Sequence, residues 1–359
     1  MFRALLALLL VTIAVPSIAA KPARSCSDLP IARNAATLGW NAAGLQRARD
    51  EARRGGAAAF MVVTGGKVVI ADGALAKPML IASVRKSIMS ALIGQAIAEG
   101  KLARTDPISK FGINEDSPLT ETERYATVRD LLMARSGVYL PTAAETAAMR
   151  ANRPARGSHA PGSFWFYNNW DFNVLGNLYE RATAKGDFIA FQRRIAEPIC
   201  MQDFDAYENT WYSYNQGAPR FPAYHMALSP RDLMRFGMLY LQKGRWGGTQ
   251  VVPEAWVAES TQPLSMTEVG VPLHGAYGYL WWITTPDPSG IAPAIPPGSF
   301  TASGSGGQEM TVIPALDTVI LVRADTTPDQ KGASIFKSAA EWQKFVQLTL
   351  AARLPAKGN

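Results

Sequence analysis

Strand-forming segments stand near both ends of this 359-residue chain, and the long stretch between them has mostly helical patterns. Near the N-terminal end, AAFMVVTGGKVVIADG (58–73) contains two β-rich runs joined by two glycines, the signature of a two-residue hairpin. Strand patterns return only after Trp246. This order predicts one α/β domain built from both ends of the chain, residues 21–99 and 245–359. A mostly helical domain, residues 100–244, is inserted in its middle.

The central stretch carries clear helix-start signals. In LSPRDLMRFGMLYLQKG (228–244), Ser229 is a candidate N-cap and Pro230 follows at the first helical turn. Thr127 takes the same place before VRDLLMARSG. With 48% hydrophobic residues, a chain of this length can bury a large core.

The first twenty residues have the layout of a cleavable secretory signal. One arginine precedes the apolar run Ala4 to Val15, and small residues follow at Ser17, Ala19 and Ala20. The apolar run is too short to span a bilayer comfortably, so no stable membrane span is expected after cleavage. We therefore expect residues 1–20 to be a signal peptide and the protein to be exported, to the periplasm or outside the cell.

Charge and metal-ligand content exclude several classes of function. The net charge is +7 and falls to about +6 without the signal, and no basic run is longer than a pair, so nucleic-acid binding is not indicated. Three histidines and two cysteines, none of them clustered, predict neither a metal site nor a cofactor. In an oxidising compartment Cys26 and Cys200 either form one disulfide or stay free, and the sequence leaves both open.

A serine and a lysine stand three residues apart at the start of an apolar helical run. In LIASVRKSIMSALIGQAIAEGK (80–101), the apolar spacing predicts a helix over 83–99, on which Ser83 and Lys86 are neighbours. A serine hydroxyl needs an adjacent base to become a nucleophile. Burial and the positive end of a helix both disfavour an ammonium ion, so Lys86 could serve as that base. The alternative is an ordinary capping serine, since Ser-x-x-Lys occurs again at Ser334 and Lys337.

Two further patterns are candidates for the same site. APGSFWFYNNWDFNVLG contains Tyr167 and Asn169 as Tyr-x-Asn directly before a helix, a place from which side chains can point into a cleft. A second copy, Tyr207 and Asn209, lacks this context. In FTASGSGGQ (300–308), small residues let a strand edge run close to a substrate. The alternative for that segment is a glycine-rich turn between strands.

Taken together, Ser-x-x-Lys, Tyr-x-Asn and then a small-residue strand resemble the serine β-lactamase and penicillin-binding-protein superfamily. Tyr-x-Asn in place of Ser-Asp-Asn makes the chain similar to the class C β-lactamase branch, with its esterase, D-aminopeptidase and 6-aminohexanoate-dimer hydrolase relatives. The resemblance spans roughly residues 40–345, including ATVRDLLMARSG and PGSFWFYNNWDFNVLG. It implies an α/β (α+β) fold of the β-lactamase/transpeptidase type, an antiparallel sheet flanked by helices with an inserted helical domain.

The resemblance also implies roles for the motif residues. Ser83 would be the acylated nucleophile, Lys86 its proton partner and Tyr167 the general acid/base. Asn169 would contact a substrate amide, and the N–H groups of Ser83 and Ser305 would form the oxyanion hole. Ser303 and Gly304 would line the substrate-binding strand.

The third motif departs from the family pattern. Where the family usually has Lys-Thr-Gly or His-x-Gly, this chain has Ala302-Ser303-Gly304. The missing lysine would hold a substrate carboxylate, so a neutral ester or linear amide is as compatible as a β-lactam. One cation about 4 Å from a phenol is worth about 4 kcal/mol, roughly three pKa units. One such cation is expected to bring the pKa of Tyr167 from about 10 toward 7 before desolvation raises it again, so Lys86 alone is expected to suffice, with less margin.

Two other readings compete with a serine hydrolase of this type. A Ser-His-Asp enzyme needs a Gly-x-Ser-x-Gly elbow, which the sequence lacks, and His159 is expected to line the cleft from a loop. A catalytically inactive periplasmic module that binds peptidoglycan or a protein partner is the other alternative. The sequence leaves open the natural substrate, the oligomeric state and whether Lys86 or Tyr167 takes the first proton.

Overall fold

The structure, a computed structural model, describes residues 26–214, 220–267, 275–286, 295–326, 335–336 and 339–354. The predicted signal peptide lies outside the described residues, as do His274 and the second Ser-x-x-Lys at Ser334 and Lys337. Within the described ranges, no helix is long and apolar enough to cross a membrane.

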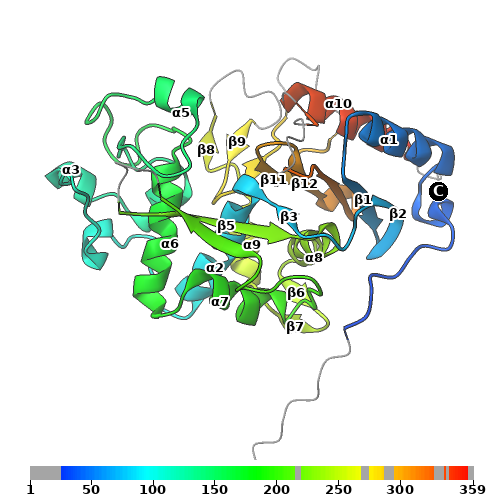
Figure 1. Ribbon diagram of the computed structural model, residues 1–359, viewed down its shortest axis with the longest axis horizontal. Helices are drawn as coiled ribbons and strands as arrows, with labels where there is room; N and C mark the ends of the chain where they lie inside the picture. The colour runs from blue at the N-terminus through cyan, green and yellow to red at the C-terminus, as the bar shows by residue number, and fades with distance from the viewer. Residues whose placement is uncertain are drawn as a thin grey trace, which may run out of the picture.

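An eight-stranded antiparallel sheet joins the two ends of the chain (Figure 1). Its order is β2-β1-β13-β12-β11-β10-β9-β8, so the N-terminal hairpin lies beside the last strand. The strands are β1 (Ala59–Thr64), β2 (Lys67–Gly73), β8 (Ser265–Met266), β9 (Ala276–Tyr277), β10 (Trp282–Ile283), β11 (Phe300–Gly304), β12 (Gln308–Ile313) and β13 (Thr318–Arg323). This sheet confirms the predicted α/β class with an antiparallel sheet flanked by helices.

The hairpin β1–β2 turns at the predicted glycines. Gly65 and Gly66 have φ of 58° and 71°, left-handed values that a two-residue hairpin turn requires and that glycine adopts without strain. On its other side β1 pairs with β13, with Ala59 opposite Arg323 and Thr64 opposite Thr318. Residues more than 250 positions apart in the chain therefore pair directly in this sheet.

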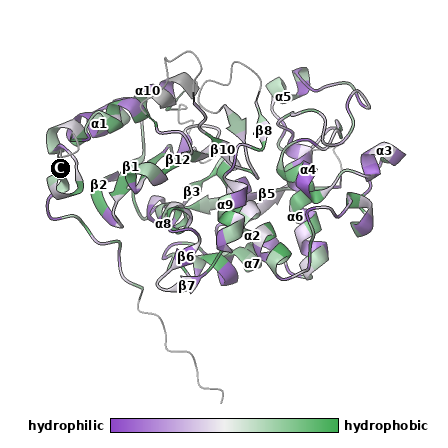
Figure 2. Ribbon diagram, turned by 180° about the vertical axis from the view of Figure 1, so that it is seen from behind, coloured by the Kyte–Doolittle hydropathy of each residue, from purple (hydrophilic) through white to green (hydrophobic). Residues whose placement is uncertain are grey.

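Helices cover both faces of the sheet because its central strands are apolar on both sides. Phe60 and Val62 point to one face, where α1 (Ala42–Arg54) and α10 (Ala339–Leu350) pack side by side. Met61 and Val63 point to the other face, which α8 (Pro230–Leu241) covers. In Figure 2 the surface helix α1 carries both polar and apolar residues, as an amphipathic helix should.

A three-stranded sheet lies next to the main one and leads to the site. Its order is β3-β5-β4, with β3 (Met79–Leu80), β4 (Thr210–Ser213) and β5 (Ala223–Leu228), and a small hairpin forms from β6 (Arg245–Trp246) and β7 (Thr249–Gln250). The buried guanidinium of Arg323 joins the two larger sheets. It donates to the carbonyls of Met79 (2.8 Å), Leu80 (3.2 Å) and Leu228 (3.0 Å), and its Nε donates to Gln308 Oε1 (2.6 Å).

The helix after β3 is buried all round. In α2 (Arg85–Ala98) every side chain from Arg85 to Ala96 is buried, between α6 (Asn169–Thr183), α7 (Asp187–Phe191) and α9 (Glu254–Ser260). At Gly94, a Cβ atom would lie 2.3 Å from the Trp256 ring, so only glycine permits this contact. Burial on all sides explains why a lysine on this helix does not reach water.

The remaining helices are short. They are α3 (Glu121–Arg124), α4 (Val128–Leu132), α5 (Ala147–Ala151), the 3-10 turns η1 (Ala35–Leu38), η2 (Ala82–Val84), η3 (Ile108–Phe111) and η5 (Pro314–Leu316), and the π-helical turn η4 (Gln192–Ala196). The predicted caps are confirmed, since Ser229 accepts from the backbone N–H of Asp232 and Thr127 from that of Asp130.

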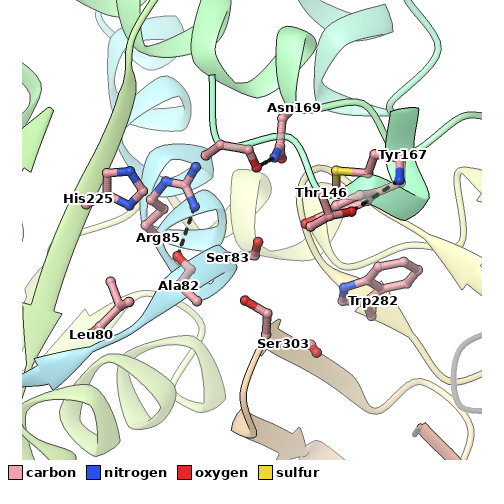
Figure 3. A pocket seen from close by; sticks show the side chains of 13 residues that line it. Leu80, Ala82, Ser83, Arg85, Thr146, Tyr167, Asn169, His225, Trp282 and Ser303 are labelled. Atoms are coloured by element: carbon pink, nitrogen blue, oxygen red, sulfur yellow. Dashed lines mark hydrogen bonds between the residues drawn. The ribbon is translucent and has the colours of Figure 1, made fainter. Parts of the chain in front are cut away.

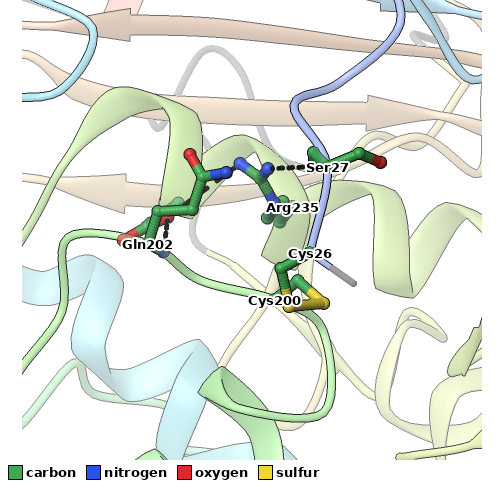
Figure 4. The surroundings of a disulfide bond; sticks show 6 residues. Cys26, Ser27, Cys200, Gln202 and Arg235 are labelled. Atoms are coloured by element: carbon green, nitrogen blue, oxygen red, sulfur yellow. Dashed lines mark hydrogen bonds and ion pairs between the residues drawn. A yellow bond between two sulfur atoms is a disulfide. The ribbon is translucent and has the colours of Figure 1, made fainter. Parts of the chain in front are cut away.

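A disulfide joins Cys26 to Cys200, resolving the question that the sequence left open (Figure 4). It ties the first described residue to the segment after η4. Beside it, Arg235 donates a hydrogen bond to the backbone carbonyl of Ser27 (3.0 Å). The extended N-terminal segment is thus fixed against α8.

Candidate active site

Ser83 lies in a tight turn between β3 and α2, not on the first turn of the helix as predicted. Residues 82–84 form the 3-10 turn η2, and α2 begins at Arg85. Ala82 has a left-handed φ of 45°, a conformation that costs energy for a residue with a Cβ and is typical of functional sites. Because neither η2 nor α2 has a side-chain cap bond, the alternative of a simple capping serine is wrong.

Lys86 lies at the centre of a buried polar cluster. Its Nζ lies 3.0 Å from Ser83 Oγ, 2.5 Å from the Tyr167 hydroxyl and 2.7 Å from Asn169 Oδ1. It also sits over the rings of Tyr167 and Phe172, 4.2 Å and 4.4 Å from their centroids. Burial and then the positive charge of Arg85 hold the pKa of Lys86 well below its ordinary value. A lowered pKa favours the neutral amine, which can accept a proton from Ser83.

Tyr167 and Asn169 reach Lys86 from the chain that enters α6. Asn168 caps this helix by accepting from the N–H of Trp170 (3.1 Å), and it donates to the carbonyl of Val138 (2.7 Å). The amide of Asn169 bridges Lys86 and the carbonyl of Ala144, to which its Nδ2 donates (2.7 Å). Asn169 therefore holds Lys86 in place, besides lining the cavity as expected.

The pKa of Tyr167 moves in the direction opposite to the one expected. Desolvation raises it to about 12, and a hydrogen bond with Ser83 and the charge of Arg85 offset this only in part. The expected lowering assumed a cationic Lys86, but burial also lowers the pKa of Lys86 and so disfavours its cationic form. A ring of Trp282, stacked 5.4 Å away, helps to exclude water from the phenol.

The strand β11 forms the opposite wall. A Cβ on Gly304 would lie 2.6 Å from the carbonyl of Ile81 and 3.1 Å from the backbone N of Ser83, so glycine lets β11 press against the turn that holds the serine. Ser303 donates from its Oγ to the buried carboxyl group of Glu309 (2.8 Å). Desolvation raises the pKa of Glu309 to about 8, which keeps it protonated at neutral pH. Ser305 is exposed at the rim.

A cavity of about 290 Å³ opens between these elements (Figure 3). It is lined by Ser83, Tyr167, Asn169, Ser303 and Ser305, together with Leu80, Ala82, Arg85, Ala144, Thr146, Met149, His225 and Trp282. Lys86 lies behind Ser83, and Gly304 beside its backbone. The structure therefore brings all seven predicted site residues to one place.

Other expected residues lie elsewhere. His159 does not line this cavity: its ring stacks on Phe164 (4.1 Å between centroids), and Nδ1 contacts the hydroxyl groups of Tyr139 and Ser158. In the second Tyr-x-Asn copy, Tyr207 is exposed and Asn209 accepts from the N–H of Asp205. Among the described residues, no group of three potential ligands could hold a metal ion.

Eight of the residues that line the cavity were not expected from the sequence, among them Arg85, His225 and Trp282. His225 on β5 contacts Ser213 Oγ through Nε2 (2.7 Å) and stacks on Trp211. Desolvation, followed by the charges of Arg85 and Lys86, lowers its pKa to about 4, so it is neutral at pH 7. Arg85 stands inside the Ser-x-x-Lys motif itself, but nothing in the spacing showed that its side chain faces the cavity.

Comparisons with known proteins agree with this fold. The Beta-lactamase family model matches residues 42–341. A candidate beta-lactamase from Bacteroides dorei DSM 17855 is 18% identical, with a TM-score of 0.64 over 85% of this chain and 97% of that one. A candidate 6-aminohexanoate-dimer hydrolase from Bacillus anthracis is 20% identical, with a TM-score of 0.62 over 86% and 83%. An octameric penicillin-binding protein homologue from Pyrococcus abyssi is 18% identical, with a TM-score of 0.62 over 88% and 78%. The chain belongs to the beta-lactamase family.

Proposed function

We propose that this protein is an exported serine hydrolase that cleaves an amide or ester through an acyl-enzyme on Ser83. The observation that carries the proposal is the position of the Lys86 amine, 3.0 Å from Ser83 Oγ and 2.5 Å from the Tyr167 hydroxyl. An alcohol, an amine and a phenol within hydrogen-bond distance at one cavity are sufficient for acyl transfer.

In the first step, Ser83 Oγ attacks the substrate carbonyl carbon while its proton passes to Lys86. Lys86 is the first proton acceptor because its pKa is lowered, whereas that of Tyr167 is raised. The negative charge that develops on the carbonyl oxygen is met by the backbone N–H groups of Ser83 and Ser305, which flank the cavity from the turn and from the end of β11.

The leaving group departs with a proton. Tyr167 donates its hydroxyl proton to the leaving nitrogen or oxygen and is reprotonated by Lys86, with which it shares a short hydrogen bond. The acyl-enzyme is then hydrolysed by water, whose proton goes to the Lys86–Tyr167 pair, and Ser83 regains its own. At the end of the cycle Ser83, Lys86 and Tyr167 have regained their starting protonation states, and no step uses a metal or a cofactor.

The cavity is compatible with a β-lactam, a linear amide or a carboxylic ester. Its volume of about 290 Å³ suits a small acyl group. The third motif provides no lysine on β11, so the β-lactam is not favoured over the other two. The signal layout of residues 1–20 and the disulfide between Cys26 and Cys200 both support export.

Covalent labelling tests the proposal. The wild-type protein is treated with a fluorophosphonate or a penicillin probe, and the adduct is located by peptide mapping. We expect labelling of Ser83, which disappears in Ser83→Ala and persists in Ser334→Ala, the matched variant at the second Ser-x-x-Lys. A wild-type protein that is neither labelled nor active would instead favour an inactive binding module. Turnover of nitrocefin compared with a 4-nitrophenyl ester then ranks the lactamase against the esterase activity.

A further inference from the structure

The wall of the cavity carries one positive charge and no carboxylate. Among the described residues that line it, Arg85 is the only one with a charged side chain at pH 7, since His225 is neutral and the rest are apolar or uncharged. Figure 3 shows Arg85 on the side of the cavity toward His225, whereas Ser303 faces it from the other side. A cavity of one sign attracts ligands of the opposite sign.

Arg85 has almost no partners inside the protein. The side chain is 3% exposed, and its Nη1 donates to the carbonyl of Ala82 (3.0 Å). Its guanidinium also lies 5.1 Å from the centre of the Tyr224 ring. Nε and Nη2 are buried without any hydrogen-bond partner among the described residues. Asp187 lines a second, much smaller cavity together with Arg85, but it accepts no hydrogen bond from these two nitrogens. A buried guanidinium stays charged, so leaving it unpaired is costly.

Nε and Nη2 together form one edge of the guanidinium group. Other arginines of this protein bind carboxylates with the same edge. Among the described residues, four other arginines donate from Nε and Nη2 to both oxygens of one carboxylate each: Arg53 to Asp72, Arg153 to Glu145, Arg156 to Glu123 and Arg231 to Asp203. This edge matches the two oxygens of a carboxylate in a bidentate pair. In Arg85 this edge is covered, so a carboxylate in the cavity would reach it only if the guanidinium turned away from Ala82.

We propose that Arg85 binds a carboxylate of the substrate, so that this enzyme acts on amides or esters that carry a second, negatively charged group. The inference rests on the proposed function and narrows its substrate class. The charged group would be recognised on the β5 side of Ser83, not at β11, where the family's third-motif lysine would stand. A substrate carboxylate would accept the hydrogen bonds of Nε and Nη2, for which Arg85 has no partner among the described residues.

Arg85 has two other effects that the test must separate from recognition. Its bond to the Ala82 carbonyl supports the left-handed residue before Ser83, and its charge favours the neutral form of Lys86. Both effects act on every substrate alike. Carboxylate recognition, in contrast, changes the ratio between a charged substrate and its neutral analogue.

Binding to Ser83→Ala measures recognition without turnover. Two pairs of amides are titrated by NMR: N-acetyl-4-aminobutyrate against its carboxamide, with the charge on the amine side, and glutaric acid monoanilide against its carboxamide, with the charge on the acyl side. In at least one pair we expect the carboxylate to bind about tenfold tighter or more, as for a charged hydrogen bond. Adding Arg85→Met should bring that ratio close to one and leave the neutral ligand within about threefold.

Two further variants control for folding and for net charge. Arg85→Lys keeps a cation and is expected to retain part of the preference. Arg49→Met removes a charge from α1, where Arg49 pairs with Asp50, and should leave the preference unchanged. Each variant is compared by thermal unfolding.

Equal affinity of the charged and neutral members in both pairs would overturn the proposal. A uniform loss for all ligands in Arg85→Met would also overturn it and would leave Arg85 as a positioning residue. A preference that depends on Arg85 in a protein whose Ser83 is not labelled would keep the anion site and refute the hydrolase. If Ser83 is labelled but neither pair shows a preference for the carboxylate, the hydrolase would stand and the anion site would be refuted.

Discussion

Lys86 Nζ and the Tyr167 hydroxyl are 2.5 Å apart, although the two residues are separated by 81 positions in the sequence. Desolvation lowers the pKa of the amine and raises that of the phenol. Both shifts favour the neutral forms of the two groups, and a proton can pass between them with little movement. In the proposed mechanism, this pairing makes Lys86 the base and Tyr167 the acid.

Replacing Lys86 should abolish most of the activity. We expect Lys86→Met to lower kcat for a 4-nitrophenyl ester by roughly 10²–10⁴-fold, the usual contribution of a general base. Lys86→Arg is the matched control, because a guanidinium keeps hydrogen-bond donors at this position but cannot accept a proton. Activity in Lys86→Arg close to wild type would contradict the role of a neutral amine. The rate of fluorophosphonate labelling should fall in parallel with kcat.

Tyr167→Phe should keep the fold and lose most turnover. The ring still packs against Trp282, whereas the hydroxyl that protonates the leaving group is gone. The loss should be larger for an amide than for a 4-nitrophenyl ester, because the nitrophenolate leaves without a proton. Tyr139→Phe removes a hydroxyl that contacts His159 away from the cavity and should be near neutral. Wild-type amidase rates in Tyr167→Phe would remove this tyrosine from the mechanism.

Glu309 should make the stability of the protein depend on pH. Its pKa is about 8 in the folded state, above the ordinary value of 4.5. Between these two pH values the folded state holds a proton that the unfolded chain releases, so the free energy of unfolding falls as pH rises through this window. The decrease due to this group should amount to a few kcal/mol, since one pKa unit is worth about 1.4 kcal/mol.

Glu309→Gln tests that dependence. The amide can still accept the hydrogen bond from Ser303 but does not titrate. In urea titrations at pH 5 and pH 8.5, the difference between the two pH values should be smaller in the variant than in the wild type. Equal differences would show that Glu309 titrates normally in the folded protein.

Arg323→Met should destabilise the protein and disturb the site indirectly. The change leaves the carbonyls of Met79, Leu80 and Leu228 without the donor that joins β3 and β5 to β13. Each buried group left unpaired costs about 1–3 kcal/mol, so a total of about 3 kcal/mol or more is expected. Chemical denaturation measures it, with Arg49→Met on the surface of α1 as the control. A change below about 0.5 kcal/mol, typical of surface sites, would contradict this role.

Local patterns in the sequence were sufficient to predict several helices and turns and to identify the motif residues. The hairpin at Gly65-Gly66, the caps at Thr127 and Ser229 and the helix after Ser83 follow from turn chemistry and spacing, which depend on residues close in the chain. The same patterns placed Ser83 and Lys86 next to each other. The division into residues 21–99 with 245–359 and an inserted 100–244 stays a prediction.

The burial, the pKa shifts and the contacts of these residues were decided only by the tertiary structure. Lys86 has a lowered pKa because α2 is packed on every side, and Tyr167 has a raised pKa because the same packing excludes water. Ser83 leaves the helix because β11 and β3 hold its turn, and Arg85 lines the cavity with two nitrogen atoms that no described side chain hydrogen-bonds. Desolvation and partner geometry come from segments distant in the chain, and spacing along one segment carries no information about them.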